Sequence, residues 1–387
     1  MIKDPMKPIL FIGHDASRTG APFVLLHLLR WLKRYVPERH FELLLLNGGE
    51  LESEFRSVCN VHILYTQVSG TRINYFAKTA RSLRKRAGLE ERLLSRLAAR
   101  FDVVLGNTAV SLEHLSFFKS RGCSTFCWMH EMDYALDLFY SRERFRELAE
   151  ETDALIVGSQ AVREMLLRRG ITRPVHVVYE FLDLDASGKT DINDLKAENG
   201  IPADAFVVGA CATIEWRKGV DLFVQIARLL ATRDPNVYCM WLGGRSIAAQ
   251  ATMDQVLYDV RKLGLDGRVL FVDPQHELSR YYRAMDLFLL PSREDPFPLV
   301  CIEAALCKKP VICFRDAGGM PEFVEDDCGF VVPYLDVEAA ADRIHQLSAD
   351  PQLRKKMGEA AAAKVRDRHD VSHGAVKILK IIDNSGT

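Results

Sequence analysis

The side chains best suited to chemistry lie between Ser292 and Glu303, where the chain reads Ser-Arg-Glu-Asp-Pro-Phe-Pro-Leu-Val-Cys-Ile-Glu. Pro296 and Pro298 disfavour helical backbone in the residue before each, so a loop is expected up to Pro298, which suits the first helical position. An acidic loop that leads into a helix places a carboxylate, Asp295, beside unpaired backbone amides, and such amides bind phosphate groups. Glu303, one turn into the helix, can reach past the phosphates to a ribose.

Short apolar runs alternate with helical patterns along the whole chain and predict the strands that position this loop. Strand–helix alternation is typical of parallel sheets with helices on both faces, which is the α/β class. In such sheets ligands bind at the carboxyl ends of the strands. The expected strands are Ile9–Ile12, Phe41–Leu46, Val103–Leu105, Ser124–Trp128, Ala154–Val157, Val175–Val178, Phe206–Ala210, Val237–Leu242, Val269–Phe271, Leu287–Leu290, Val311–Phe314 and Gly329–Val332.

Length and one polar segment predict two domains. A chain of 387 residues is too long for one ordinary hydrophobic core. Asp183–Asn199 is polar and has the composition of a linker, which gives expected domains of 1–182 and 183–370. A last helical pattern runs from about Ala360 to Ile382.

Composition disfavours several classes of protein. A net charge of −1 argues against a general nucleic-acid binder, because the chain has no excess of cations. No apolar stretch is long enough to span a bilayer, and Ile9–Ile12 is too short for a signal-peptide core. Nine scattered cysteines without a Cys-x-x-Cys pattern indicate core thiols in a reducing cytosol rather than zinc ligands or disulfides.

A basic turn follows the predicted strand Phe206–Ala210. The sequence Glu215-Trp216-Arg217-Lys218-Gly219 places two adjacent cations at a helix start. Fixed cations there can neutralise a diphosphate leaving group as negative charge builds on it. Considered alone, a solvated basic turn is the simpler interpretation. The acidic loop in the same half of the chain favours the functional one.

Two further loops at strand ends are candidates for the first domain. Ile12–Pro22 has neither the dinucleotide nor the P-loop glycine pattern, but Gly20 still permits close approach of backbone amides to a ligand. An ordinary strand-to-helix turn is the alternative. Phe126–Glu131 ends in His130-Glu131, and a lone histidine there is equally compatible with a structural and a functional role.

Together these motifs resemble those of retaining nucleotide-sugar glycosyltransferases with the GT-B fold, family GT4. Their signature has an acidic residue, seven others, then Glu, which here is Asp295 and Glu303. The resemblance implies two Rossmann-like doubly wound domains facing across a cleft, with 1–182 on the acceptor side and 183–370 binding the nucleotide sugar. It also implies that the helix at about 371–387 packs back on the first domain.

The resemblance assigns roles to single residues. Asp295 would bind hydroxyls of the transferred sugar, Glu303 the ribose hydroxyls, and His130 the donor sugar or the forming positive charge. Asn107 and Ser159 are weaker candidates for the acceptor side. Residues implied to surround the diphosphate are Gly20, Arg217, Lys218, Phe297, Pro298, Leu299 and Val300, and no metal or other cofactor is expected. The chain departs from the pattern at Cys211-Ala212, where relatives often carry an Arg, and at Lys308, where they carry Gly.

We therefore expect a retaining glycosyltransferase that moves a sugar from a nucleotide diphosphate donor to a glycan or lipid-linked acceptor, in the synthesis of cell-surface polysaccharide or glycoconjugate. A non-catalytic GT-B-like ligand-binding or partner subunit is the alternative. A nicotinamide oxidoreductase is disfavoured by the missing glycine fingerprint. The basic segment 72–100 either contacts an anionic membrane from the cytoplasm or forms a solvated helix face over a core stripe.

Overall fold

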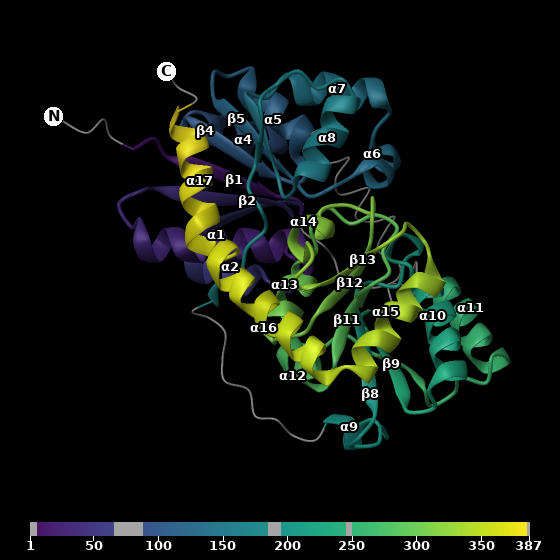
Figure 1. Ribbon diagram of the computed structural model, residues 1–387. Coiled ribbons are helices and arrows are strands. Elements are labelled where there is room, and N and C mark those ends of the chain that lie inside the picture. Colours follow the sequence, from purple (N-terminus) through teal and green to yellow (C-terminus); the bar gives the residue numbers. More distant parts are fainter. Residues whose placement is uncertain (1–5, 66–87, 185–194, 245–249, 385–387) are drawn as a thin grey trace. The chain divides into compact units, whose positions relative to one another are not determined.

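The computed structural model describes residues 6–65, 88–184, 195–244 and 250–384 (Figure 1). The chain divides into two compact units, one of Met1–Asp183 with Val371–Thr387 and one of Leu184–Asp370. Each unit is a doubly wound α/β fold with one parallel sheet. The predicted fold class of two Rossmann-like parallel-sheet domains is confirmed.

The first unit is built on a seven-stranded parallel sheet in the order β3-β2-β1-β4-β5-β6-β7. Its strands are β1 (Ile9–Gly13), β2 (Phe41–Asn47), β3 (Asn60–Tyr65), β4 (Val103–Asn107), β5 (Ser124–Met129), β6 (Ala154–Val157) and β7 (Val175–Val177). Its helices are α1 (Gly20–Tyr35), α2 (Glu52–Val58), α4 (Leu89–Ala98), α5 (Leu112–Lys119), α6 (Asp133–Phe139), α7 (Arg142–Glu150), α8 (Gln160–Arg168) and α17 (Val371–Asn384).

The second unit has a six-stranded parallel sheet in the order β10-β9-β8-β11-β12-β13. Its strands are β8 (Phe206–Cys211), β9 (Val237–Leu242), β10 (Val269–Val272), β11 (Leu287–Leu290), β12 (Val311–Phe314) and β13 (Gly329–Val332). Its helices are α9 (Leu195–Glu198), α10 (Val220–Arg233), α11 (Gln250–Lys262), α12 (Leu278–Ala284), α13 (Leu299–Leu306), α14 (Met320–Val324), α15 (Val337–Ala349) and α16 (Pro351–Arg368).

Each sheet reverses its strand order at one place, and that place determines where loops converge. In the first sheet β1 pairs with β4, and in the second β8 pairs with β11. The loops that leave the carboxyl ends of these paired strands lie side by side because the helices that follow them turn in opposite directions. In the first unit the loop after β1 leads to Gly20, but His130 follows β5. In the second unit these loops carry Arg217, Lys218 and Asp295 and lead into α13, which carries Glu303.

All twelve predicted strands are present, but the sequence did not predict β3. This strand pairs with β2 at the sheet edge, with Glu42 opposite Asn60. Most of its side chains are half-buried or exposed, so it lacks the continuous apolar run that marked the other strands.

The C-terminal helical pattern was wrongly treated as one segment, because the structure ends α16 at Arg368 and begins α17 at Val371. The ring of His369, in the break, is buried between Phe297 and Phe323, with centroids 5.3 Å and 5.4 Å apart. Beyond the break, α17 (yellow in Figure 1) packs against α1. A Cβ atom at Gly374 would lie 2.1 Å from the ring of Phe181, so this glycine permits close packing.

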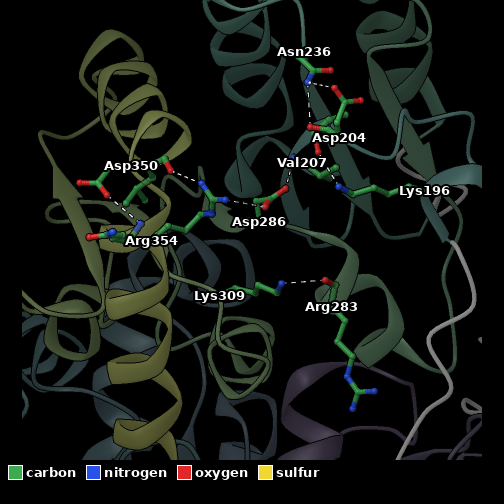
Figure 2. A network of polar contacts seen from close by, with 12 residues as sticks. Lys196, Asp204, Val207, Asn236, Arg283, Asp286, Lys309, Asp350 and Arg354 are labelled. Carbon is green, nitrogen blue, oxygen red and sulfur yellow. Dashed lines mark hydrogen bonds and ion pairs between the residues drawn. The ribbon is translucent and has the colours of Figure 1, made fainter.

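A polar network joins residues at the amino-terminal ends of strands in the second sheet (Figure 2). The Asp286 carboxylate accepts the Val207 amide at 2.9 Å and pairs with Arg354 at 3.6 Å. The ammonium of Lys309 donates to the carbonyl of Arg283 at 3.0 Å. The preceding Lys308 has a φ of 61°, so the residue that replaces glycine does adopt left-handed backbone.

All nine cysteines have free thiols in the structure, and seven of them are buried, all but Cys59 and Cys307. Within the described ranges, every helix is either too short or too polar to span a lipid bilayer.

Candidate active site

The two loops at the reversal point of the second sheet are tied together by reciprocal hydrogen bonds. Nη1 of Arg217 donates to the carbonyl of Glu294 at 2.9 Å. In the opposite direction, the amide of Arg293 donates to the carbonyl of Arg217 at 2.8 Å. The basic turn and the acidic loop, which the sequence presented as separate motifs, therefore form one structure. We call it the interlocked loops, residues 215–219 and 291–297.

Lys218 and Asp295, which were predicted to bind the diphosphate and the transferred sugar of the donor, form an ion pair with one another. Nζ of Lys218 lies 2.5 Å from Oδ2 of Asp295, and the two side chains are only 15% and 7% exposed. The hydroxyl of Ser292 donates to the same carboxylate oxygen at 3.3 Å, and the amide of Asp295 donates to the carbonyl of Ala317 at 2.7 Å. Lys218 consequently offers the site an ammonium that is already partly neutralised.

Gly219 allows the interlocked loops to approach one another. Its φ is 73°, in the left-handed region that favours glycine. A Cβ atom there would lie 1.9 Å from the carbonyl oxygen of Pro291, which is closer than any side chain can approach. The glycine is therefore required by both its backbone conformation and its neighbour.

The acidic loop continues into α13 as predicted, with one difference. Pro298 is the residue before the helix, with extended backbone, and the first helical residue is Leu299. The prediction that Pro298 is the first helical residue was therefore wrong by one position. Pro298 is the N-cap instead, and its carbonyl accepts a hydrogen bond from the amide of Cys301 at 3.1 Å. The amides of Leu299 and Val300 open the helix, where a first-turn amide has no acceptor within the helix. Phe297 is buried against His369.

Glu303 lies on α13 beside two residues that the sequence did not identify as site residues. The buried hydroxyl of Tyr282, from α12, donates to Oε2 of Glu303 at 2.9 Å. Burial raises the pKa of Glu303, and the hydrogen bond from Tyr282 opposes that shift only in part. Burial also raises the pKa of the nearby Cys211 thiol to about 12, so this cysteine is neutral. No local pattern could have linked Tyr282 to Glu303, because helix α12 and helix α13 are separated by strand β11.

His130 has both ring nitrogens engaged within the first unit. The Asn107 side-chain nitrogen donates to the carbonyl of Ala21 at 2.9 Å, which turns its oxygen toward His130. Nε2 of His130 therefore donates to that oxygen at 2.8 Å, while Nδ1 donates to the carboxylate of Glu180 at 2.9 Å. Burial lowers the pKa of His130, but the adjacent Glu180 and Glu131 carboxylates outweigh it and raise the pKa overall. Because both ring nitrogens face oxygen acceptors, this arrangement favours the protonated ring.

The chain of hydrogen bonds through Asn107 joins the two loops at the reversal point of the first sheet. Gly20 is the first residue of α1, and Ala21 follows it. A Cβ atom at Gly20 would meet no described atom within 4 Å, so packing does not require glycine there. Thr108, next to Asn107, has a φ of 100°, which is strained for a branched side chain. Backbone strain of this kind is concentrated at functional sites.

Of the ten residues predicted to take part in catalysis or donor binding, the structure places eight on the second unit and two, Gly20 and His130, on the first. Asn107 and Ser159, the weaker candidates for the acceptor side, also lie on the first unit. Among the described residues, no group of three His, Cys, Asp or Glu side chains could hold a metal ion. Much of the basic segment, residues 72–87, lies outside the described residues. Most of its remainder forms α4 (Leu89–Ala98), in which Leu94 and Leu97 are buried core residues.

Two family models match consecutive parts of the chain. The model described as Glycosyltransferase Family 4 matches residues 19–186, and the model described as Glycosyl transferases group 1 matches residues 191–364. Together they cover both units. The chain belongs to the family 4, group 1 glycosyltransferases.

Curated members of this family with similar sequences include D-inositol 3-phosphate glycosyltransferases. That of Saccharomonospora viridis is 29% identical over 224 residues, which are 56% of this chain and 52% of the relative. That of Mycobacterium tuberculosis is 32% identical over 225 residues, 56% of this chain and 46% of the relative. The chain therefore spans about half the length of the curated relatives it matches.

Solved GT-B glycosyltransferase structures share the fold over nearly the whole chain. Anabaena Alr3699/HepE, solved with UDP and glucose, has a TM-score of 0.82 at 23% identity and covers 97% of this chain and 99% of its own. Sucrose-phosphate synthase from Thermosynechococcus elongatus has a TM-score of 0.75 at 19% identity and covers 98% of each chain. These solved structures show that the chain has the GT-B fold.

Proposed function

We propose that this protein is a retaining glycosyltransferase that moves a sugar from a nucleotide diphosphate sugar to a glycan or lipid-linked acceptor, in the synthesis of cell-surface polysaccharide or glycoconjugate. The observation that carries the proposal is the interlock of the two loops after β8 and β11. It brings Arg217, Lys218 and Asp295 to the one edge of the second sheet where α/β folds bind nucleotides.

The charges of the site residues account for the proposed sugar transfer. As the bond between sugar and diphosphate breaks, negative charge grows on the diphosphate, and Arg217, Lys218 and the first amides of α13 stabilise that charge. Glu303 accepts hydrogen bonds from the ribose, and Asp295 accepts them from hydroxyls of the transferred sugar. Two cations beside a helix start supply the charge that a metal supplies in other transferases, so the proposed reaction needs no metal.

The family relatives guide the choice of ligands to test. HepE was solved in complex with UDP and with UDP-glucose, and the curated relatives are named for D-inositol 3-phosphate. Thermal unfolding with a panel of sugar nucleotides, UDP-glucose among them, tests the donor, since a bound ligand raises Tm by mass action. Acceptor tests then compare glycans, lipid-linked sugars and D-inositol 3-phosphate.

Two observations favour the alternative of a non-catalytic ligand-binding subunit. Ala212 occupies the place of a further Arg, and Lys218 is already paired with Asp295. Release of nucleoside diphosphate from sugar nucleotides, measured with and without acceptor, distinguishes the two functions. Tight donor binding without turnover, with each acceptor class present, would support the binding subunit.

A further inference from the structure

We propose that Arg293 is a positioning residue that fixes the basic turn, and with it the ammonium of Lys218, against the acidic loop. This inference rests on the proposed function, in which Lys218 faces the departing diphosphate. Arg293 immediately precedes Glu294 and Asp295, yet its side chain points away from that pair and onto the turn at 216–221.

The guanidinium of Arg293 makes three kinds of contact with the basic turn. Its two terminal nitrogens bind the two carboxylate oxygens of Asp221 at 2.8 Å and 2.7 Å. Nη1 also donates to the carbonyl of Trp216 at 2.7 Å. The guanidinium carbon lies 4.7 Å from the centroid of the Trp216 ring. A planar fork that also stacks on a ring is geometry that arginine provides and lysine does not.

These contacts fix the turn at both ends. At one end, the carbonyl of Trp216 accepts a hydrogen bond from the side chain of Arg293, and the carbonyl of Arg217 accepts one from its amide. At the other end, Asp221 in the first turn of α10 binds the guanidinium of Arg293. Lys218 lies between these anchors and has little freedom to move. Misplacement of a catalytic group by about 1 Å can cost on the order of a hundredfold in rate, so this constraint matters for turnover.

A purely stabilising role accounts less well for this arrangement. The side chain of Asp221 is 40% exposed, although that of Arg293 is only 11% exposed. Solvent screens the exposed carboxylate of this pair, so a contribution to stability alone does not explain why the guanidinium also binds the carbonyl and the ring of Trp216. Its geometric specificity is better explained by the need to place Lys218.

Chemical labelling tests the placement without any assay of activity. The rate at which acetic anhydride acetylates Lys218, measured by peptide mass spectrometry, reports how well the ammonium is held against Asp295. We expect Arg293→Met to raise that rate on the order of tenfold, because the turn opens locally. Asp221→Asn, an isosteric second variant, should act in the same direction. Arg233→Met, which breaks the Arg233–Asp342 pair at the other end of α10, is the matched control. An unchanged rate in both test variants would overturn the proposal.

Kinetics test whether the placement serves the reaction. Arg293→Met should lower kcat about tenfold to a hundredfold with little change in KM. Arg293→Lys should lower kcat nearly as much, because lysine cannot reproduce the planar, two-pronged contact. In a Lys218→Met background, Arg293→Met should have no further effect, because the two residues act through the same ammonium. Additive losses would refute the positioning role. A wild-type protein that turns over no sugar nucleotide would refute the proposed function instead, and the labelling result would still decide the role of Arg293.

Discussion

The ammonium of Lys218 and the carboxylate of Asp295 lie 2.5 Å apart, across two loops separated by 77 positions in the sequence. Each of these two groups is therefore the charged partner of the other. A donor that places its diphosphate at Lys218 and its sugar at Asp295 must exchange that ion pair for contacts with the ligand. Both residues thus contribute to stability as well as to the proposed reaction.

The two contributions can be separated by substitution. Lys218→Met leaves the mostly buried Asp295 carboxylate without its cation, and we expect a loss of about 2–4 kcal/mol in the free energy of unfolding. Adding Asp295→Asn removes the uncompensated charge and should recover much of that loss. Turnover of donor should remain low in the double variant. Denaturant unfolding and single-turnover kinetics measure the two effects, and recovery of both together would contradict the assignment of Lys218 to catalysis.

Glu303 and Tyr282 should together govern how nucleotide affinity depends on pH. Burial raises the pKa of Glu303, so this carboxylate takes up a proton at a higher pH than an ordinary carboxylate does. As pH is lowered, donor affinity should therefore begin to fall at a higher pH. Tyr282→Phe removes only the hydroxyl that stabilises the carboxylate and should move this pH dependence further upward, with a loss in affinity of about threefold to thirtyfold near neutral pH. Calorimetric titration with nucleoside diphosphate measures both. Cys211 and Cys307, the other titratable groups near Glu303, stay neutral because burial raises the pKa of each thiol.

The neighbouring Tyr281→Phe is the matched control, because Tyr281 is also buried on α12. A pH dependence of affinity that is identical in Tyr282→Phe and in the wild type would rule out the proposed coupling. Stability gives an independent readout. A carboxyl whose pKa is raised on folding binds more protons in the folded state, so stability falls as pH rises from about 4.5 through that raised pKa. Glu303→Gln should therefore raise Tm at neutral pH while it weakens nucleotide binding.

His130 predicts a change of stability with pH in the same direction as Glu303, beginning at about pH 6.5 rather than at about pH 4.5. Its pKa is raised in the folded state, so its stabilising contribution is fully present below about pH 6.5, the unfolded value, and is lost as pH rises through the folded pKa. His130→Asn should show a flatter stability profile across this range. Thermal unfolding between about pH 5.5 and pH 9 measures it, and parallel profiles for the two proteins would exclude an imidazolium at this position.

Sequence reasoning was most successful where the signal is local. Buried strands such as Leu287–Leu290 are continuous apolar runs, whereas β3 is a half-exposed edge strand and has no such run. The break at His369 was missed because no Gly or Pro marks it. The break is stabilised by burial of the imidazole between Phe297 and Phe323, which are distant in sequence.

In the candidate site, too, local sequence signals were predictable and contacts between distant residues were not. Each charged residue was found in its own motif, but the pairings Lys218–Asp295 and Tyr282–Glu303 depend on which strands are neighbours in the sheet. The strand order that places β8 beside β11 is a property of the whole fold. Periodicity predicted the strands but not their order, so residue types were predictable and their partners were not.

Two glycines of the candidate site should respond differently to alanine. At Gly219 a Cβ atom would lie 1.9 Å from the carbonyl oxygen of Pro291 and the backbone is left-handed, so Gly219→Ala must separate the interlocked loops. We expect a loss of about 3–5 kcal/mol in stability, together with most of the turnover. At Gly20 a Cβ atom meets no described atom within 4 Å, so Gly20→Ala should leave Tm nearly unchanged. If Gly20 lies beside the bound diphosphate, the same change should weaken donor affinity alone. Unfolding and donor titration of the two variants test this contrast, and an unaltered donor affinity in Gly20→Ala would remove Gly20 from the site.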